Sequence, residues 1–212
     1  MDDRQSMSVR RKLANATAQP HESLHSHPWI ASLTDPDLTC ERYSLVLSAY
    51  LRFFQAVEGV RVRMGAFTEC ALNSNIEALS RDTEGCYPLY SDAVHADLTH
   101  AEGSCDALIG ALYVVHGAGF GAKTLGAAVM TNLPGAKCEY LSAGTSPKLW
   151  RSLLAELERL GGSPARQEVV FDAAAQTFAR FGRFVQSFCE GASTGSLVAA
   201  PFEGRARGSL VY

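Results

Sequence analysis

The sequence predicts a single-domain, all-α fold, and three observations support this prediction. The chain has 212 residues, of which 47% are hydrophobic and 19% are charged, which is enough apolar material for the core of one domain. Apolar residues recur at helical spacing along most of its length, whereas convincing β-strand patterns are scarce. Helical patterns lie on both sides of a central glycine-rich stretch, so the alternation of strands and helices that builds a parallel sheet is missing.

The composition argues against several classes of protein. A net charge of −3 does not indicate a broad basic surface, so we expect no nucleic-acid partner. The central apolar stretch is interrupted by His116 and Lys123, and we expect no membrane span. The polar N-terminus is unlike a signal peptide, which favours a cytoplasmic protein. The cysteines have no C-x-x-C pair, and we expect them to be reduced and mostly buried. They are Cys40, Cys70, Cys86, Cys105, Cys138 and Cys189.

The first half of the chain begins with a charged segment, residues 1–12, that we expect to be flexible. A short helix is predicted over 13–24, with Thr17 as its N-cap because Pro20 is tolerated only in a first turn. His21 and His25 then lie one turn apart on the same face.

Three further helices are predicted before the central stretch. The clearest starts near Glu41, stops at Gly59 and carries a stripe at alternating spacings of four and three residues. That stripe consists of Tyr43, Leu47, Tyr50, Phe54 and Val57. A second helix is expected over 67–80, and a shorter one near 89–100 that ends before Gly103.

Two helices are predicted after the central stretch. Pro147 can open the first, which residues 161–162 would stop. The second covers about 164–190 and carries an aromatic stripe typical of a core: Phe171, Phe178, Phe181, Val185 and Phe188. The folded domain is therefore expected to span 13–190, followed by a flexible tail over 191–212.

The central stretch, residues 105–131, contains five glycines, although each glycine inside a helix costs about 0.5–1 kcal/mol relative to alanine. One interpretation is a phosphate-binding turn, since residues 117–122 fit G-x-G-x-x-A and Glu139 lies about 20 residues beyond. The same residues approach a P-loop through Lys123-Thr124, but Ala122 stands where its second glycine should be.

Two other interpretations treat the stretch as a helix. Gly110, Gly117 and Gly121 could form one flat face that allows close approach of a ligand, or the small residues could serve tight helix packing. The scarcity of strands favours a single helix bent at its glycines. A glycine face suits a flat apolar ligand, of which heme is the leading candidate, and histidine could supply the opposing iron ligand. The six histidines are His21, His25, His27, His95, His100 and His116.

Several motifs, in order, resemble the heme oxygenase family, most closely its bacterial, biliverdin-producing branch. Leu13-x-x-x-Thr17-x-x-x-His21 resembles the N-terminal motif that carries the proximal histidine. Asp97-Leu98 and Gly110-Ala111-Leu112-Tyr113-Val114-Val115-His116-Gly117-x-x-Phe120-Gly121-Ala122 resemble the lead-in and the distal helix. Leu149-Trp150-Arg151 resembles a later helix start. The matches cover about residues 13–190.

The resemblance implies a helical fold with heme between a proximal helix and a bent distal helix. His21 would ligate the iron, and Gly117 and Gly121 would be the distal glycines over the heme. The implied reaction is oxidative cleavage of heme to biliverdin, carbon monoxide and ferrous iron. Heme would be both cofactor and substrate, dioxygen would be consumed, and electrons would come from a separate donor such as a ferredoxin or a flavin reductase.

The chain departs from the family at some positions. Ala118 stands where many members have an aspartate, and Ala122 would add a methyl on or beside the heme face. His25 stands where some members have a glutamate. For the heme propionates, the candidate cations are Arg180 and Arg183 on the last helix, and Arg10, Arg11 and Lys12 before His21. Two alternatives stay open: a non-catalytic heme carrier or sensor on the same fold, and a nucleotide-binding α/β enzyme.

Overall fold

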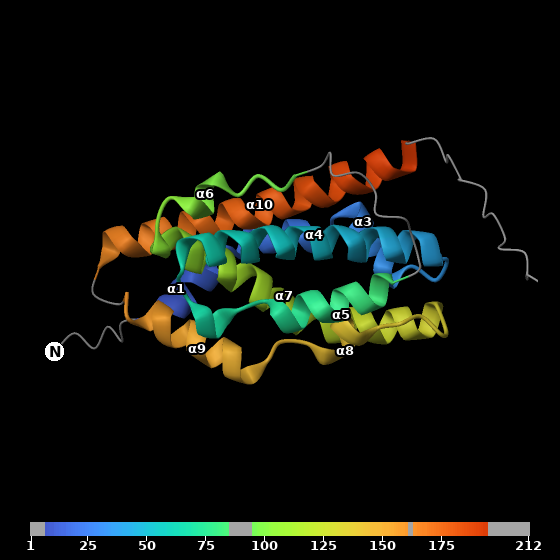
Figure 1. The fold of residues 1–212 in the computed structure, drawn as a ribbon, viewed down its shortest axis with the longest axis horizontal. Coiled ribbons are helices and arrows are strands. Elements are labelled where there is room, and N and C mark those ends of the chain that lie inside the picture. Colours follow the sequence, from blue (N-terminus) through green and yellow to red (C-terminus); the bar gives the residue numbers. More distant parts are fainter. Residues whose placement is uncertain (1–6, 85–94, 161–162, 195–212) are drawn as a thin grey trace, which may run out of the picture.

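A computed structural model describes residues 7–84, 95–160 and 163–194, and within these ranges every regular element is a helix (Figure 1). In chain order the helices are α1 (Val9–Ala16), α2 (Ala18–His25), α3 (Pro28–Ala31), η1 (Ser32–Thr34), α4 (Cys40–Met64), η2 (Thr68–Cys70), α5 (Asn73–Thr83), α6 (Thr99–Glu102), α7 (Cys105–Asn132), α8 (Glu139–Ala143), α9 (Pro147–Glu158) and α10 (Pro164–Thr194). The all-α prediction is confirmed. The nucleotide-binding α/β alternative is wrong, because residues 117–122 continue a helix where that motif needs a strand and a turn.

The N-terminal region forms two short helices where the sequence suggested one. The helix α1 begins at Val9, inside the segment expected to be flexible, and Val9 is buried. The break falls at Thr17, one turn before Pro20, whose ring would clash with the carbonyl of Ala16 in a continuous helix. Thr17 takes the N-cap position of α2, but its hydroxyl makes no cap hydrogen bond and donates instead to the Leu13 carbonyl at 2.9 Å. The break turns α2 into a separate element that carries His21.

The helix α4 is longer than the sequence suggested. It continues through Gly59 to Met64 and ends at Gly65, which has a φ of 60°. A single interior glycine costs only about 1 kcal/mol, and the buried Val60 beyond it continues the packed face. The end at Gly65 has a different cause, since a left-handed residue cannot extend the helix and glycine adopts that conformation without strain.

The two helices expected over 67–80 and 89–100 differ from their predictions. The first consists of η2 followed by α5, which extends to Thr83. Of the second, residues 89–94 lie outside the described ranges, and 95–98 are not helical. The helix α6 starts only at Thr99, because the carboxylate of Asp97 accepts hydrogen bonds from the Thr99 amide at 3.1 Å and from its hydroxyl at 2.8 Å. Such side-chain bonds offer the backbone an alternative to the helix.

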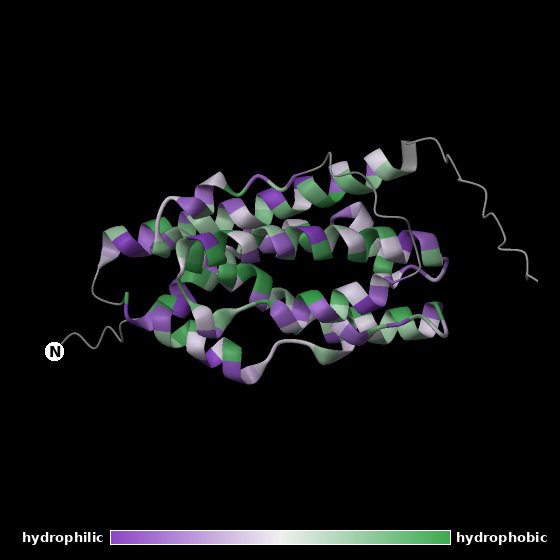
Figure 2. Cartoon of the chain, in the orientation of Figure 1, coloured by the Kyte–Doolittle hydropathy of each residue, from purple (hydrophilic) through white to green (hydrophobic). Residues whose placement is uncertain are grey.

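The core lies between the long helices, with α7 packed most extensively against α10 (Figure 1). Each long helix carries hydrophobic and hydrophilic residues in Figure 2, as expected for elements with one side toward the core. By length and composition α7 is the one described helix that could cross a membrane, but 61% of its most apolar window is buried inside this fold. Burial of that kind is typical of a core helix.

Three glycines of α7 allow close packing against other parts of the chain. A Cβ on Gly110 would lie 2.5 Å from the Val170 carbonyl oxygen of α10. A Cβ on Gly126 would lie 3.1 Å from the Leu141 Cβ of α8. A Cβ on Gly119 would lie 2.7 Å from the Thr145 amide nitrogen. A side chain at Gly110 or Gly119 would therefore collide with neighbouring atoms, and one at Gly126 would make a tight contact with Leu141.

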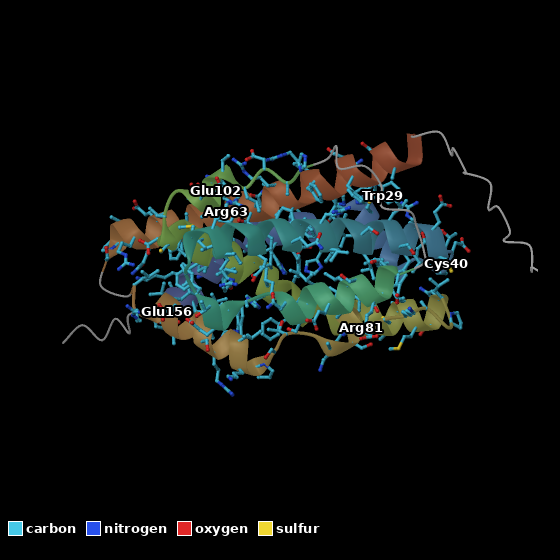
Figure 3. The ribbon with its side chains drawn as sticks, viewed as in Figure 1. Trp29, Cys40, Arg63, Arg81, Glu102 and Glu156 are labelled. Carbon is cyan, nitrogen blue, oxygen red and sulfur yellow. The ribbon has the colours of Figure 1, made fainter. Side chains whose placement is uncertain are left out.

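Charged side chains hold the start of α8 against α5 and join α4 to α6. The buried Asp82 of α5 accepts hydrogen bonds from the first amides of α8, those of Glu139 at 2.7 Å and Tyr140 at 2.8 Å. Arg81 pairs with Glu139 at 2.6 Å, so α5 holds the start of α8 in two ways. Arg63 and Glu102, which are labelled in Figure 3, form an ion pair that joins α4 to α6.

Candidate functional site

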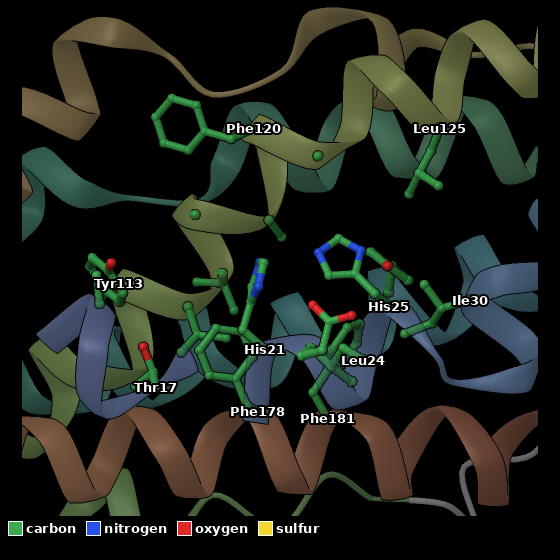
Figure 4. A pocket seen from close by; sticks show the side chains of 18 of the residues that line it. Thr17, His21, Leu24, His25, Ile30, Tyr113, Phe120, Leu125, Phe178 and Phe181 are labelled. Carbon is green, nitrogen blue, oxygen red and sulfur yellow. The ribbon is translucent and has the colours of Figure 1, made fainter. Parts of the chain in front are cut away.

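A cavity of about 820 Å³ lies between α2 on one side and α7 on the other, with α4 and α10 contributing aromatic residues (Figure 4). Its volume falls within the range of roughly 300–1,000 Å³ typical of small-molecule sites. Its lining is mainly apolar, with a few polar groups concentrated on α1 and α2. The cavity is thus suited to a large, mostly hydrophobic ligand that needs a small number of polar contacts.

Two imidazoles project into this cavity from α2. His21 and His25 are one turn apart, and their ring centroids lie 4.6 Å from each other in an edge-on arrangement. Figure 4 shows both rings directed toward α7. Burial lowers the pKa of His21, His25 lowers it further, and Glu22 raises it. The His21 ring is therefore neutral at pH 7, which is the form that ligates a metal.

The opposite wall is formed by the two glycines that the sequence placed there. A Cβ on Gly117 would have its nearest neighbour at 4.0 Å, a ring carbon of Trp150, and a Cβ on Gly121 would meet nothing within 4 Å. Both glycines line the cavity. Since no packing contact explains their lack of a side chain, these positions leave the helix backbone open toward the cavity.

The other small residues of α7 are divided between cavity and core. Ala118 lines the cavity, as the sequence suggested. Ala122 does not, because its methyl is buried in the hydrophobic core, so the expectation that it lies on the ligand face is wrong. Gly110 packs against α10, so of the two helical interpretations tight helix packing holds for this glycine, and the ligand face does not include it. A helix that packs on several sides leaves only one short stretch of its face open.

The far side of this glycine wall is held by a loop. Thr145, just before α9, donates a hydrogen bond from its hydroxyl to the His116 carbonyl at 2.7 Å. The absence of a side chain on Gly119 lets the loop approach so closely. The His116 ring points away from the cavity, and its Nε2 donates to the Cys70 carbonyl at 2.9 Å. His116 is thus used for packing, and burial lowers its pKa.

Of the cationic side chains expected at the cavity, the structure places Arg10 there but not Arg180 or Arg183. Arg10 lines the cavity and lies over the Trp150 ring, with 6.0 Å between its guanidinium carbon and the ring centroid. Arg180 does not line the cavity: it forms an ion pair with Asp97 and donates to the Asp97 carbonyl at 3.1 Å. Arg183 is exposed and is also absent from the lining. Both arginines lie on α10, whose cavity face is formed by Phe178 and Phe181 instead.

The structure adds residues that the sequence did not indicate. Tyr113 and Thr124 are the polar side chains that α7 contributes to the cavity, and burial raises the pKa of Tyr113. Trp150 of α9 stacks near Tyr113 and Phe120, with ring centroids 5.4 and 4.9 Å away. Ala14 and Thr17 line the cavity between Arg10, which the sequence had offered as a candidate cation, and His21.

Other candidate residues lie away from the cavity. His27, His95 and His100 do not line it. Glu139, considered as a ribose-binding acid, pairs with Arg81. Within the described ranges, no group of three or more His, Cys, Asp or Glu residues could hold a metal ion. Of the five described cysteines, Cys70, Cys138 and Cys189 are buried, and Cys40 and Cys105 are exposed. Cys86 lies outside the described residues.

Comparison with known proteins shows similarity in structure but not in sequence. No family model matches the sequence, and no curated protein matches it. The fold is similar to heme oxygenase from Leptospira interrogans, with a TM-score of 0.66 and 18% identity over 85% of this chain and 100% of that one.

Two further solved structures have a similar fold. Heme oxygenase from Neisseria meningitidis, in its NO- and CO-bound forms, gives a TM-score of 0.67 and 18% identity over 87% of this chain and 93% of that one. Heme oxygenase-1 from the cyanobacterium Synechocystis, in complex with heme, gives a TM-score of 0.64 and 12% identity over 88% of this chain and 96% of that one. The chain therefore has the all-α heme oxygenase fold.

Proposed function

We propose that the protein is a heme oxygenase, which binds heme in the cavity between α2 and α7. The observation that supports this most is the pairing of a neutral imidazole, His21, with a facing stretch of α7 that has no side chains at Gly117 and Gly121. A porphyrin needs an axial ligand on one face and little steric bulk on the other. The three solved proteins with a similar fold are all heme oxygenases, and the structure of one of them contains heme.

The residues of the cavity fit a heme group. His21 would ligate the iron, and Phe178 and Phe181 offer apolar contacts to the ring system from α10. Gly117 and Gly121 would allow the α7 backbone to lie close to the opposite face. Bound heme supplies the oxidative chemistry itself, in which dioxygen and electrons from a separate donor open the ring to biliverdin, carbon monoxide and ferrous iron. A ferredoxin or a flavin reductase would be a suitable donor.

The chain's own task in this proposal is to orient the ligand and control access of water. The side chain of Trp150 packs against Phe120, and its ring is the nearest neighbour of a Cβ on Gly117, at 4.0 Å. Thr124 and Tyr113 supply hydroxyls at the α7 wall, where Ala118 offers none. A hydroxyl can order a water near the reacting face, so these two residues are the candidates for organising distal waters, which an aspartate does in many heme oxygenases.

A titration with hemin followed by reduction in air tests the proposal. We expect a sharp Soret band that saturates at one equivalent, then decays to the broad red absorbance of biliverdin when ascorbate or a ferredoxin system is added. A Soret band that survives reductant and oxygen would instead support a heme carrier or sensor, for which the apolar Ala118 is the relevant observation. A protein that forms no Soret band would contradict both functions.

Arg10 is proposed to bind a heme propionate, in place of Arg180 and Arg183. We expect Arg10→Ala to weaken hemin binding by about tenfold, since a charge-assisted hydrogen bond contributes about 1.5–3 kcal/mol and solvent screens part of it at this exposed site. The measurement is the dissociation constant of hemin at two salt concentrations. Arg11→Ala is the matched control, because Arg11 is exposed and does not line the cavity. Equal losses in both variants would show a general charge effect and rule out a specific contact.

A further inference from the structure

The segment His21-Glu22-Ser23-Leu24-His25 combines two histidines at a spacing of four with a glutamate after the first. On a helix this spacing directs both imidazoles to one side, and the pattern H-E-x-x-H holds a divalent metal in other proteins. Here the pattern occupies α2, and His21, Glu22 and His25 all line the cavity. Heme ligation would use His21 alone, so the proposed function gives His25 and Glu22 no role.

The distance between the two rings fits a shared metal ion. With metal–nitrogen bonds of about 2.0–2.1 Å, two imidazoles on one ion have ring centroids about 4.5 Å apart at a right angle and about 5 Å apart at a tetrahedral angle. The observed separation is 4.6 Å. Both rings project from the same side of α2 into the cavity (Figure 4), where solvent and a metal ion can reach them.

We propose that His21 and His25 bind a divalent transition-metal ion of the class that prefers imidazole, such as Ni²⁺, Cu²⁺ or Zn²⁺, in the heme-free protein. Two protein ligands leave the remaining coordination positions to water. Glu22 also lines the cavity, and its carboxylate would be the acceptor available for a hydrogen bond from such a water. The site is an addition to the fold's heme cavity, because it depends on a second histidine.

Metal and heme would compete for this site. This part of the proposal rests on the proposed function, because it requires His21 to be the heme ligand. One imidazole cannot ligate two metals at the same nitrogen, and an ion between His21 and His25 would occupy space that the porphyrin needs. The protein would then bind heme less readily when such a metal is present, through direct competition at one helix.

Calorimetric titration of the apoprotein with Ni²⁺ tests the metal site. Nickel is the suitable probe because the exposed Cys40 and Cys105 would compete for softer ions through their thiols. We expect one equivalent to bind, and His25→Ala or His25→Gln to weaken binding by about tenfold or more, because each removes one of two protein ligands. His21→Ala should have the same effect. His95→Ala is the matched control, since His95 is exposed and does not line the cavity.

The results separate the metal site from the proposed function. Ni²⁺ binding that stays within about twofold of the wild type in His25→Ala, or that falls equally in His95→Ala, would overturn the site. Far-ultraviolet circular dichroism shows whether each variant is folded. Hemin titrations with and without Ni²⁺ should show competition in the wild type and none in His25→Ala. If the wild type binds Ni²⁺ but no hemin, the proposed function fails and the metal site stands.

Discussion

Replacing Gly119 with alanine should lower the free energy of unfolding by about 3 kcal/mol, whereas the same change at Gly121 should leave it unchanged or raise it by about 0.5–1 kcal/mol. The two positions are half a turn apart on α7 but have opposite surroundings. A Cβ on Gly119 would lie 2.7 Å from the Thr145 amide nitrogen and 3.0 Å from the Gly144 carbonyl carbon. Those are backbone atoms, which cannot turn aside as the end of a flexible side chain can.

Urea unfolding of both variants measures this difference directly. Gly121→Ala is the matched control, because it adds the same methyl to the same helix at a place with no neighbour within 4 Å. If Gly119→Ala were as stable as the wild type, the close approach of Thr145 to α7 would be wrong. If Gly121→Ala were equally destabilised, the open space beside Gly121 would be wrong.

The same two variants separate stability from ligand binding. Gly121→Ala places a methyl on the cavity wall, so under the proposed function it should impair hemin binding or turnover in a protein that is at least as stable as the wild type. Gly119→Ala should weaken hemin binding only indirectly, by destabilising the fold. It displaces the loop whose Thr145 hydroxyl donates a hydrogen bond to the His116 carbonyl. A stable variant with altered hemin chemistry would link the Gly121 position to function and not to packing.

Replacing His21 with alanine should remove the axial ligand and lower the rate of heme degradation by at least about 100-fold, because even changes to outer-shell partners of metal ligands cost about 10–100-fold. The imidazole of His21 contacts Phe178 at a ring-centroid distance of 5.7 Å, but the residue is exposed on the cavity side and supports no core packing. The variant should therefore fold. The measurements are the Soret maximum of the hemin complex and the rate of its decay under reductant.

Added imidazole gives this experiment an internal control. A small imidazole can enter the space left in His21→Ala and restore part of the Soret band, which a structural defect would not allow. His95→Ala should behave like the wild type, because His95 is exposed and away from the cavity. A His21→Ala protein that degraded heme at the normal rate would overturn the assignment of His21.

The sequence predicted the central part of the candidate site and could not predict its edges. His21 and the glycine pair were identified because a motif and a helical spacing placed them, and both are local properties of the chain. Whether a glycine of α7 faces a cavity or a neighbouring backbone depends on where α8, α10 and the loop at Thr145 lie. For that reason the sequence left open whether Gly110 faces a ligand or packs against another helix, and it placed the Ala122 methyl on or beside the ligand face, where it does not lie.

The prediction of cationic side chains at the site had the same limit. The sequence offered Arg10 because it precedes His21 by about three helical turns, and Arg180 and Arg183 because they lie one turn apart on the last helix. Only the packing of α1 against α9 brings Arg10 to Trp150 at the cavity. Only the loop before α6 brings Asp97 to Arg180 and engages it elsewhere. Contacts between segments so far apart in the chain leave no signal in a single sequence.

Helix boundaries were missed where a local signal competed with packing. Gly59 was interpreted as a stop, but burial beyond it carried α4 on to Met64. Pro20 was accommodated by a cap at Thr17, but the chain also broke there and left α1 and α2 as two elements. The helix types were right in both cases because apolar periodicity persists over many residues, whereas an end depends on one or two.

The separation of α2 from α1 has a consequence for the energetics of ligand binding. The helix α2 contributes no buried residue of its own to the core, although it carries both cavity histidines, whereas 13 of the 28 residues of the facing helix α7 are buried. Local opening costs least where few apolar contacts must break, so α2 belongs to the least protected part of the fold. Under the proposed function, a ligand held by His21 binds only the protein in which α2 is folded against the cavity, and it stabilises that state by mass action. Affinity for the ligand and the local folding of α2 are therefore two measures of one coupled equilibrium.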